Sequence, residues 1–211
     1  MKELKQQIVK TGKKLGKKGL SPGYSGNIST RYGRYFLISP SGLPLDDLKE
    51  DDVVLIDENL KIIDGKKKPS SEAQLHIEIY KKRHDINAII HCHAPKASAF
   101  AVSETPLSLP ILTESILHFG KTIPVAKYHL FSTPEVAQET AQYFDKNDVV
   151  LMQNHGVVLG GKDLKDAYYR IDTVEYTAEV ILYAKLLGTP KELTPDEIQE
   201  IEDLRLRTKE Q

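Results

Sequence analysis

The chain has 211 residues, 40% of them hydrophobic and 28% charged, so it can bury a core and still remain soluble. Its formal charge of −1 and the absence of long runs of like charge give no reason to expect nucleic acid or a membrane surface as a partner. No apolar run in the sequence approaches the roughly 18 residues that a membrane-spanning helix needs. We therefore expect one domain over residues 1–211.

The N-terminus and the cysteine content indicate the compartment. The opening segment "MKELKQQIVK" lacks the apolar stretch of a secretory signal peptide. A single cysteine cannot form an internal disulfide, which is typical of a protein from a reducing environment. We expect a cytoplasmic protein.

The first half of the chain mixes helices with short strands. Apolar residues at helical spacing predict a helix over residues 2–19. Short apolar runs separated by Gly and Pro turns predict strands over residues 27–31, 34–39 and 52–56. A helix over residues 71–82 and a strand from Ile86 follow.

The second half contains two clear helix starts. The "STPE" of residues 132–135 combines a capping box with a first-turn proline and predicts a helix to about Phe144. The run "DVVLMQNHGVVLGG" predicts two strands joined by a bend at residues 154–156. A long helix over residues 163–187 comes next, and a last helix begins at the capping box of Thr194.

The order of these elements predicts an α/β fold. Strands and helices are interleaved, but several links between successive strands are too short to contain a crossover helix. The central sheet is therefore expected to be mostly antiparallel.

A pair of histidines stands at the end of an apolar strand, in "AIIHCHAPKA" at residues 88–97. Side chains two positions apart in a strand point the same way, so His91 and His93 share a face and Cys92 points to the other. Cys92 is expected to be a small buried hydrophobe. The histidine pair is either part of a metal site or two structural histidines.

A third imidazole would complete a facial set, since catalytic zinc sites use about three protein ligands. His155, at the bend in "QNHGVV", is the candidate, and Gly156 after it allows close backbone approach. His76 lies one helical turn after Glu72, at a spacing that two ligands can share, but we expect it to pack or to support another residue. The remaining histidines are expected to be structural: His84, His118 and His129.

Three short segments rich in small residues are candidates for binding an anion: "YSGNIST", "ISPSGLP" and "KPSSEAQ". Each is also an ordinary turn composition. Ser70 and Ser71 precede a predicted helix, whose positive end would face a bound phosphate. Glu72, directly after them, is poorly placed to bind an anion and well placed to move a proton.

Together, "SGNIS", "SPSG", "KPSSE", "HCHA" and "NHG", in this order and spacing, resemble the class II aldolase/epimerase family. The resemblance implies a three-layer α/β/α fold and a homotetramer with sites between subunits. It also implies a zinc-dependent aldolase that reversibly cleaves a ketose 1-phosphate, similar to fuculose 1-phosphate, to dihydroxyacetone phosphate and an aldehyde through an enediolate.

The resemblance also implies the site residues. One Zn²⁺ per chain would be held by Glu72, His91, His93 and His155. Glu72 would in addition be the catalytic acid and base. The substrate phosphate would be held by Gly26, Asn27, Ser41, Gly42, Ser70 and Ser71.

Two departures from the family pattern concern the aldehyde half of the site. Family aldolases have a tyrosine near "ILTES", where this chain has Thr113 and Glu114, and another in the C-terminal tail, whereas the last tyrosine here is Tyr183. Glu114 is either a residue that orients the aldehyde or a solvent-facing carboxylate. The alternatives to an aldolase are a sugar-phosphate 4-epimerase acting on ribulose 5-phosphate, a methylthioribulose-phosphate dehydratase, and a non-catalytic interaction module like the adducin head. The joint presence of Glu72 and the histidines favours an enzyme.

Overall fold

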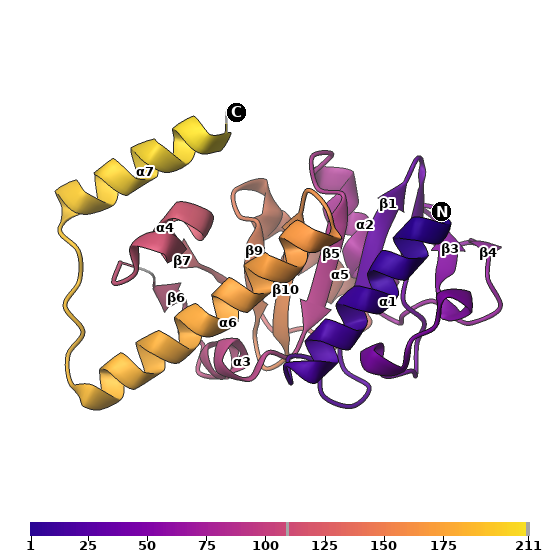
Figure 1. The fold of residues 1–211 in the computed structure, drawn as a ribbon, viewed down its shortest axis with the longest axis horizontal. Helices are drawn as coiled ribbons and strands as arrows, with labels where there is room; N and C mark the ends of the chain where they lie inside the picture. Colours follow the sequence, from indigo (N-terminus) through magenta and orange to yellow (C-terminus); the bar gives the residue numbers. More distant parts are fainter. Residues whose placement is uncertain (109, 210–211) are drawn as a thin grey trace.

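The computed structural model describes residues 1–108 and 110–209, and within them one large sheet forms the centre of the molecule (Figure 1). The strands are β1 (Asn27–Tyr32), β2 (Tyr35–Ile38), β3 (Val54–Ile56), β4 (Ile62–Asp64), β5 (Ala88–Cys92), β8 (Val125–Ala126), β9 (Val149–Met152) and β10 (Gly156–Gly161). Their order across the sheet is β4-β3-β2-β1-β5-β10-β9-β8.

Most neighbouring strands in this sheet are antiparallel. Short turns join β1 to β2, β3 to β4 and β9 to β10, so each of these pairs must reverse direction. The pairing of β8 with β9 is parallel. The prediction of a mostly antiparallel sheet is confirmed.

The register of the central strands brings distant segments of the chain to one edge of the sheet. Asn27, the first residue of β1, lies opposite His91 near the end of β5. On the other side of β5, His91 lies opposite Val158 near the start of β10. The start of β1, the end of β5 and the start of β10 therefore meet at the same edge.

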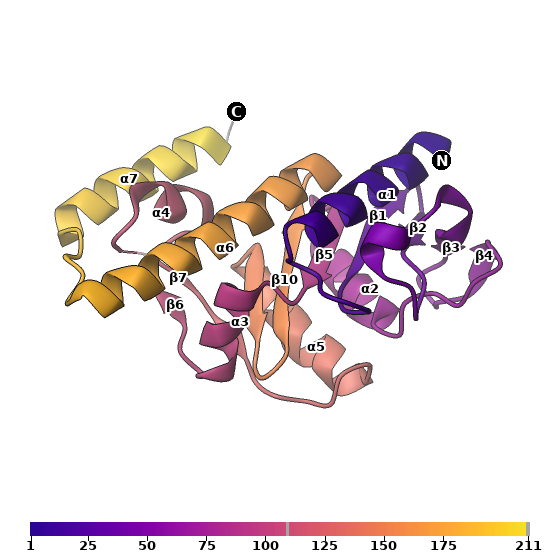
Figure 2. The same cartoon turned by 60° about the horizontal axis from the view of Figure 1, so that its bottom comes forward.

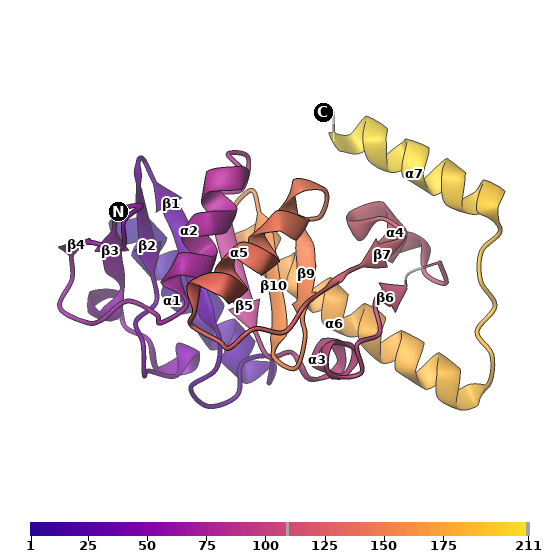
Figure 3. The ribbon, with the colours of Figure 1, turned by 180° about the vertical axis from the view of Figure 1, so that it is seen from behind.

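Helices cover both faces of the sheet. They are α1 (Lys2–Lys17), α2 (Ala73–Lys82), α3 (Pro95–Val102), α4 (Thr113–Phe119), α5 (Pro134–Gln142), α6 (Leu164–Leu187) and α7 (Pro195–Lys209). The first face carries α1, α3 and α6 (Figures 1 and 2). The opposite face carries α2 and α5, which lie in front of the sheet when the molecule is seen from behind (Figure 3). The predicted three-layer α/β/α fold is confirmed.

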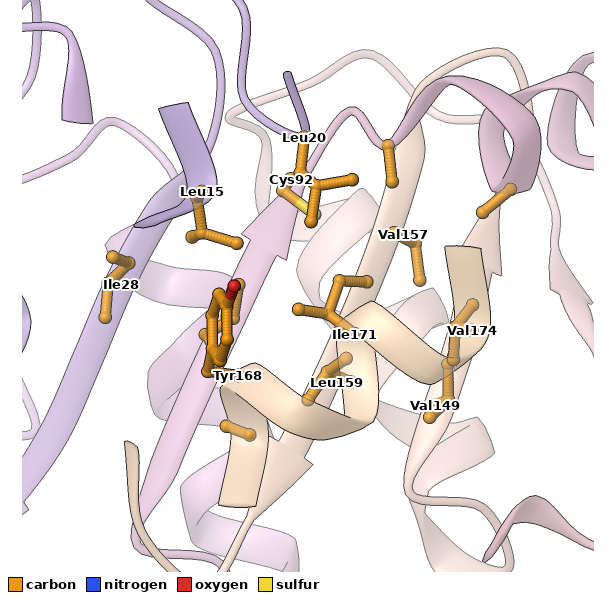
Figure 4. Packing of buried hydrophobic residues seen from close by; sticks show 14 of the residues in the cluster. Leu15, Leu20, Ile28, Cys92, Val149, Val157, Leu159, Tyr168, Ile171 and Val174 are labelled. Atoms are coloured by element: carbon orange, nitrogen blue, oxygen red, sulfur yellow. The ribbon is translucent and has the colours of Figure 1, made fainter. Parts of the chain in front are cut away.

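Alternating side chains of each strand feed two separate cores. Ile90 of β5 packs into the core beneath α1 and α6, whereas its neighbour Ile89 packs into the core beneath α2 and α5. Cys92 also lies in the first core, beside Leu20 and Val157 (Figure 4). Burial raises the pKa of its thiol to about 12, so this cysteine is the small buried hydrophobe that we expected.

Several elements between the predicted helices and strands are short. The segment between the histidine pair and "STPE" contains α3, α4, β8 and a small two-stranded sheet of β6 (Leu107–Ser108) and β7 (Thr122–Ile123). None of these was predicted, and neither was β4. At the far end of the molecule, α7 runs beside α4 (Figures 1 and 2), where Lys121 and Glu202 form an ion pair of 3.0 Å.

Some predicted boundaries shift by a few residues. The strand predicted over residues 52–56 begins only at Val54, because residues 50–52 form a turn of 3₁₀-helix. The helix predicted over residues 71–82 begins at Ala73. Among the described helices, none has the length and apolar character needed to cross a bilayer.

Candidate active site

Strand ends and one helix start position the candidate site. His91 belongs to β5 and His93 follows it directly, so both side chains project from the same face at the sheet edge. His155 lies in the turn between β9 and β10. Glu72 is the residue that precedes α2, which packs over this face of the sheet.

The structure brings the three predicted imidazoles together. The ring centroids of His91 and His155 are 4.7 Å apart, those of His93 and His155 4.9 Å, and those of His91 and His93 5.2 Å. One ring nitrogen from each histidine lies within 4.8 Å of the other two. Three neutral imidazoles at these separations can face a single cation.

The glycine after His155 is required for this close approach. A Cβ atom at Gly156 would lie 2.6 Å from the carbonyl oxygen of Cys92 and 2.9 Å from the ring of His93. Any side chain at this position would push the turn away from β5 and separate the imidazoles. The "NHG" sequence thus fixes the position of the third histidine.

The carboxylate of Glu72 faces the imidazoles from the helix side. Its Oε2 lies 3.3 Å from Nε2 of His91 and its Oε1 lies 3.6 Å from Nε2 of His155. The amide of Asn27 donates a hydrogen bond of 2.9 Å to Oε2. Burial alone would raise the pKa of the Glu72 carboxyl, but His91, His155 and the Asn27 hydrogen bond hold this pKa below its usual value.

The donor atoms fit a bound metal ion. Nδ1 of His91 donates to the carbonyl oxygen of Val157 over 3.0 Å, so the lone pair of Nε2 faces the site. That Nε2 and Oε1 of Glu72 are buried without a hydrogen-bond partner among the described residues. Burial lowers the pKa of His91 and His93 and brings that of His155 to about 4, so all three rings are neutral near pH 7. A cation held between these buried acceptors would satisfy both of them.

A pocket of about 280 Å³ opens beside the histidines. It is lined by all six residues predicted to bind phosphate: Gly26, Asn27, Ser41, Gly42, Ser70 and Ser71. Glu72, His93 and His155 line its inner wall. The anion-binding segments and the histidine cluster, which sequence reasoning treated separately, therefore form one cavity.

Two of the small-residue loops are joined to each other. The amide of Ser41 donates to the carbonyl of Lys68, and the amide of Ser70 donates to the carbonyl of Ser39, each over 3.0 Å. These bonds hold the hydroxyls of Ser41 and Ser70 on one wall of the pocket. The two loops thus form a single surface of small side chains.

Gly26 and Asn27 also line the pocket. A Cβ atom at Gly26, whose φ is +81°, would lie 2.8 Å from the carbonyl oxygen of His91, so only glycine fits there. The side-chain amide of Asn27 is already bonded to Glu72 and His76. Asn27 lines the pocket, and its side-chain amide also joins Glu72 to His76, a role that the sequence did not indicate.

Other predicted residues lie away from the pocket. The Glu114 side chain is 71% exposed, with Oε1 3.8 Å from Nε2 of His118, and it is not among the residues that line the described pocket. Tyr183 is an exposed residue of α6. His76 is fully buried and hydrogen-bonded to Asn27. It supports another residue, which is the interpretation that we preferred over a metal ligand.

Four residues of the pocket were not identified from the sequence: Tyr24, Ser25, Pro40 and Phe131. The ring of Phe131 is 61% exposed, and its centroid lies 6.4 Å from that of His155. An exposed aromatic side chain in a loop follows no periodicity, so only the fold reveals that it lies beside the site. The "YSGNIST" segment did point to the loop that contains Tyr24 and Ser25.

Neutral imidazoles, a buried carboxylate and a pocket of hydroxyls and amides at one edge of an antiparallel sheet are the groups that a metal-dependent site for an anionic substrate needs. The family model of the class II aldolase and adducin N-terminal domain matches residues 6–182, and the chain belongs to this family.

Relatives in this family carry aldolase names. The chain is 35% identical over 199 residues to a 5-deoxy-D-ribulose 1-phosphate aldolase of Bacillus thuringiensis serovar kurstaki, covering 93% of this chain and 92% of the relative. It is 39% identical over 178 residues to an L-fuculose phosphate aldolase of Methanocaldococcus jannaschii, covering 84% of this chain and 95% of the relative.

Solved structures agree with this assignment. An L-fuculose 1-phosphate aldolase superposes with a TM-score of 0.89 at 34% identity, covering 95% of each chain. The chain is therefore an enzyme of the class II aldolase type, a lyase whose class depends on a metal ion. The predicted family and the prediction of an enzyme are confirmed.

Proposed function

We propose that this protein is a zinc-dependent cytoplasmic aldolase that reversibly cleaves a ketose 1-phosphate to dihydroxyacetone phosphate and an aldehyde. The observation that carries the proposal is the placement of the Glu72 carboxylate between His91 and His155, at the inner wall of the small-residue pocket. Metal ligands, a proton carrier and an anion cradle are thereby within reach of one small substrate.

Glu72, His91, His93 and His155 would hold the metal ion. Imidazole nitrogens with one carboxylate oxygen favour zinc over magnesium or calcium, which prefer oxygen ligands. When bound, the ion supplies a Lewis acid that polarises the substrate carbonyl. We propose one zinc ion per chain.

Gly26, Asn27, Ser41, Gly42, Ser70 and Ser71 would hold the substrate phosphate. Hydroxyl groups and backbone amides are suited to phosphate oxygens, and the N-terminal end of α2 directs its positive dipole toward the same pocket. This anchor fixes the dihydroxyacetone half of the substrate relative to the Glu72 carboxylate. Binding energy from the phosphate is thereby used to orient the reacting carbons.

Glu72 would carry the proton. In the direction of synthesis, its carboxylate accepts a proton from C3 of dihydroxyacetone phosphate, the enediolate attacks the aldehyde carbon, and the C4 alkoxide so formed takes up a proton to become the hydroxyl. In the direction of cleavage, the C4 hydroxyl loses its proton as the C3–C4 bond breaks, the aldehyde leaves, and Glu72, protonated in exchange, gives a proton to C3. A lowered pKa keeps the resting carboxyl ionised and ready to accept.

The aldehyde we propose is short and ends in an apolar group. The exposed ring of Phe131 stands beside His155 at the pocket and offers an apolar contact. The named substrates of the two relatives, 5-deoxyribulose 1-phosphate and fuculose phosphate, share the dihydroxyacetone phosphate half and are both deoxy sugars that end in a methyl group. The chain's own choice between them depends on this end of the pocket.

The proposal is tested by elemental analysis and a substrate panel on the purified protein. We expect about one zinc per chain and loss of activity on chelation that zinc restores. Fuculose, 5-deoxyribulose, rhamnulose and ribulose 1-phosphates would each be tested for release of dihydroxyacetone phosphate. A protein without transition metal whose activity ignores chelators would overturn the metal site.

Ribulose 5-phosphate separates the aldolase from the alternative 4-epimerase. Inversion of this substrate without release of an aldehyde, and no cleavage of any ketose 1-phosphate, would favour the epimerase. Inactivity of the zinc-loaded protein toward the whole panel would favour a non-catalytic module.

A further inference from the structure

A line of polar side chains runs from Glu72 into the core, away from the pocket. Asn27 is bonded to the carboxylate on one side and to Nε2 of His76 on the other. Nδ1 of His76 lies 2.6 Å from the hydroxyl of Ser29, which lies 2.9 Å from the hydroxyl of Tyr80. All four side chains behind Glu72 are buried, and each contacts the next directly.

The side chains of this line come from α2 and β1, and the regular spacing of residues in each element places them. The helix row begins at Glu72, directly before α2, and continues at intervals of four with His76 and Tyr80. Residues at this spacing form one row, here on the inner face of α2. Asn27 and Ser29 are two residues apart on β1 and point toward that row. Alternate residues of the helix row and the strand row therefore interleave.

The hydrogen bonds in this line have one consistent direction. The Glu72 carboxylate can only accept, so Asn27 donates to it through its NH₂ group, and every bond behind Asn27 must then run in the same direction, beginning with the Tyr80 hydroxyl donating to Ser29. The Ser29 hydroxyl then donates to Nδ1 of His76, and this places the ring proton on Nε2. Nε2–H donates to the carbonyl end of the Asn27 amide, so the NH₂ end must face the carboxylate.

We propose that Tyr80, Ser29 and His76 form a directional donor chain that locks the Asn27 amide with its NH₂ group toward Glu72. His76 is thus a positioning residue for the proton carrier. With the opposite ring tautomer, Nε2 would become an acceptor and the amide would turn, so that its oxygen would face the carboxylate. The consequence for turnover rests on the proposed aldol cleavage, whereas the direction of the chain does not.

Burial makes the arrangement stable. Burial lowers the pKa of His76 to about 3, so the ring stays neutral and keeps one donor and one acceptor nitrogen. Because these side chains are buried away from bulk solvent, a change at Ser29 should be transmitted to Asn27. Removal of the Ser29 hydroxyl is the smallest change that tests this transmission.

The first test compares Ser29→Ala with a matched control. Without the hydroxyl, Nδ1 of His76 loses its donor and the second tautomer becomes accessible. We expect kcat to fall about 10–100-fold, the range typical of supporting groups around a metal site, with the KM for the ketose 1-phosphate changed little. Ser115→Ala is the control. The Ser115 hydroxyl is also buried, lies 2.6 Å from the hydroxyl of Thr177, and is outside the pocket, so its removal also deletes one buried hydrogen bond.

The control should lose stability but keep its kcat. If Ser29→Ala lowers kcat no more than Ser115→Ala does, Ser29 does not act through His76 and the positioning role is wrong. His76→Gln provides a rescue, because its amide can donate to Asn27 and accept from Ser29, whereas His76→Leu can do neither. Turnover by His76→Gln should exceed that of His76→Leu several-fold.

The second test reads the direction without any assay of activity. Nitrogen NMR of protein labelled in its histidines reports which ring nitrogen carries the proton, and the His76 signals are assigned by their loss in His76→Gln. We expect the Nε2–H tautomer in the wild-type protein and an increased share of the Nδ1–H tautomer in Ser29→Ala. A wild-type Nδ1–H tautomer would overturn the donor chain even in an active aldolase. An inactive protein with the expected tautomer would overturn the proposed function alone.

Discussion

Glu72 is a proposed metal ligand and a proposed proton carrier, and one substitution separates the two tasks. In Glu72→Gln the amide keeps the size and one ligating oxygen but cannot accept a proton near neutral pH. We predict near-normal zinc content and donor binding, with kcat reduced about 10²–10⁴-fold, as is typical for loss of a general base. Metal analysis and steady-state kinetics on the same sample measure both.

His93→Ala is the companion variant. It should lose zinc and activity together, since two remaining imidazoles make a poor site. Wild-type turnover by Glu72→Gln would show that another group carries the proton.

The buried neutral histidine behind the site makes a specific contribution to acid sensitivity. The pKa of His76 falls from 6.5 to about 3 in the folded chain, so between these pH values the unfolded state binds a proton that the folded state does not. Stability therefore falls as the pH falls through this window, by up to about 1.4 kcal/mol per pH unit from this residue.

His76→Gln removes this contribution while the other histidines still titrate in both proteins. Urea unfolding from about pH 7 to about pH 4.5 should give a shallower loss of unfolding free energy in the variant. Equal slopes for the two proteins would mean that His76 is not held neutral.

Much of the site could be predicted from residues alone, and the rest shows what sequence lacks. Strand alternation placed His91 and His93 on one face. Short motifs identified His155 and Glu72 as candidates, but only the fold shows that the two lie close together. Phe131 was missed because a solitary exposed ring carries no pattern.

At the level of helices and strands, periodicity and capping identified the long elements. The box at Thr194 is present, with its amide donating to Glu197 over 2.7 Å. At "STPE", the cap is Thr133 rather than Ser132, and its hydroxyl accepts from the amide of Val136. Short elements such as α3 and β6–β8 were missed, because small residues and two-residue strands take their structure from neighbours rather than from their own propensity.

The start of α3 depends on a carboxylate from another helix. Glu175 of α6 is buried and accepts hydrogen bonds from the backbone amides of Lys96 and Ala97, at 3.0–3.1 Å. α3 has no side-chain cap of its own, and it begins two residues after His93. We predict that Glu175→Ala lowers the unfolding free energy by about 2–3 kcal/mol, since charged acceptors of buried amides are costly to remove.

Glu197→Ala is the matched variant on α7, where the same kind of backbone cap is exposed to solvent. Its cost should stay near or below about 1 kcal/mol. Urea unfolding of both variants measures the difference, and equal costs would mean that burial does not strengthen the Glu175 cap.

For the whole molecule, exposed apolar side chains on one chain are consistent with assembly. Tyr24, Leu130 and Phe131 are largely exposed, and Tyr24 and Phe131 line the pocket. We predict a homotetramer, in which the pocket lies against a neighbouring subunit. Light scattering should give a mass close to four times 23.7 kDa. A stable monomer with full activity would contradict sites between subunits.

The strand register also determines when the site can exist during folding. Asn27, His91 and Val158 come from distant parts of the chain, and a slip of one residue would put Cys92 in place of His91 and an imidazole into the apolar core. Pairing between distant segments is the slow part of folding, whereas helices form early. Cobalt(II) added to refolding protein should therefore develop its ligand-field absorption after the far-ultraviolet helix signal. The coordinated ion would report that the three central strands have paired in the correct register.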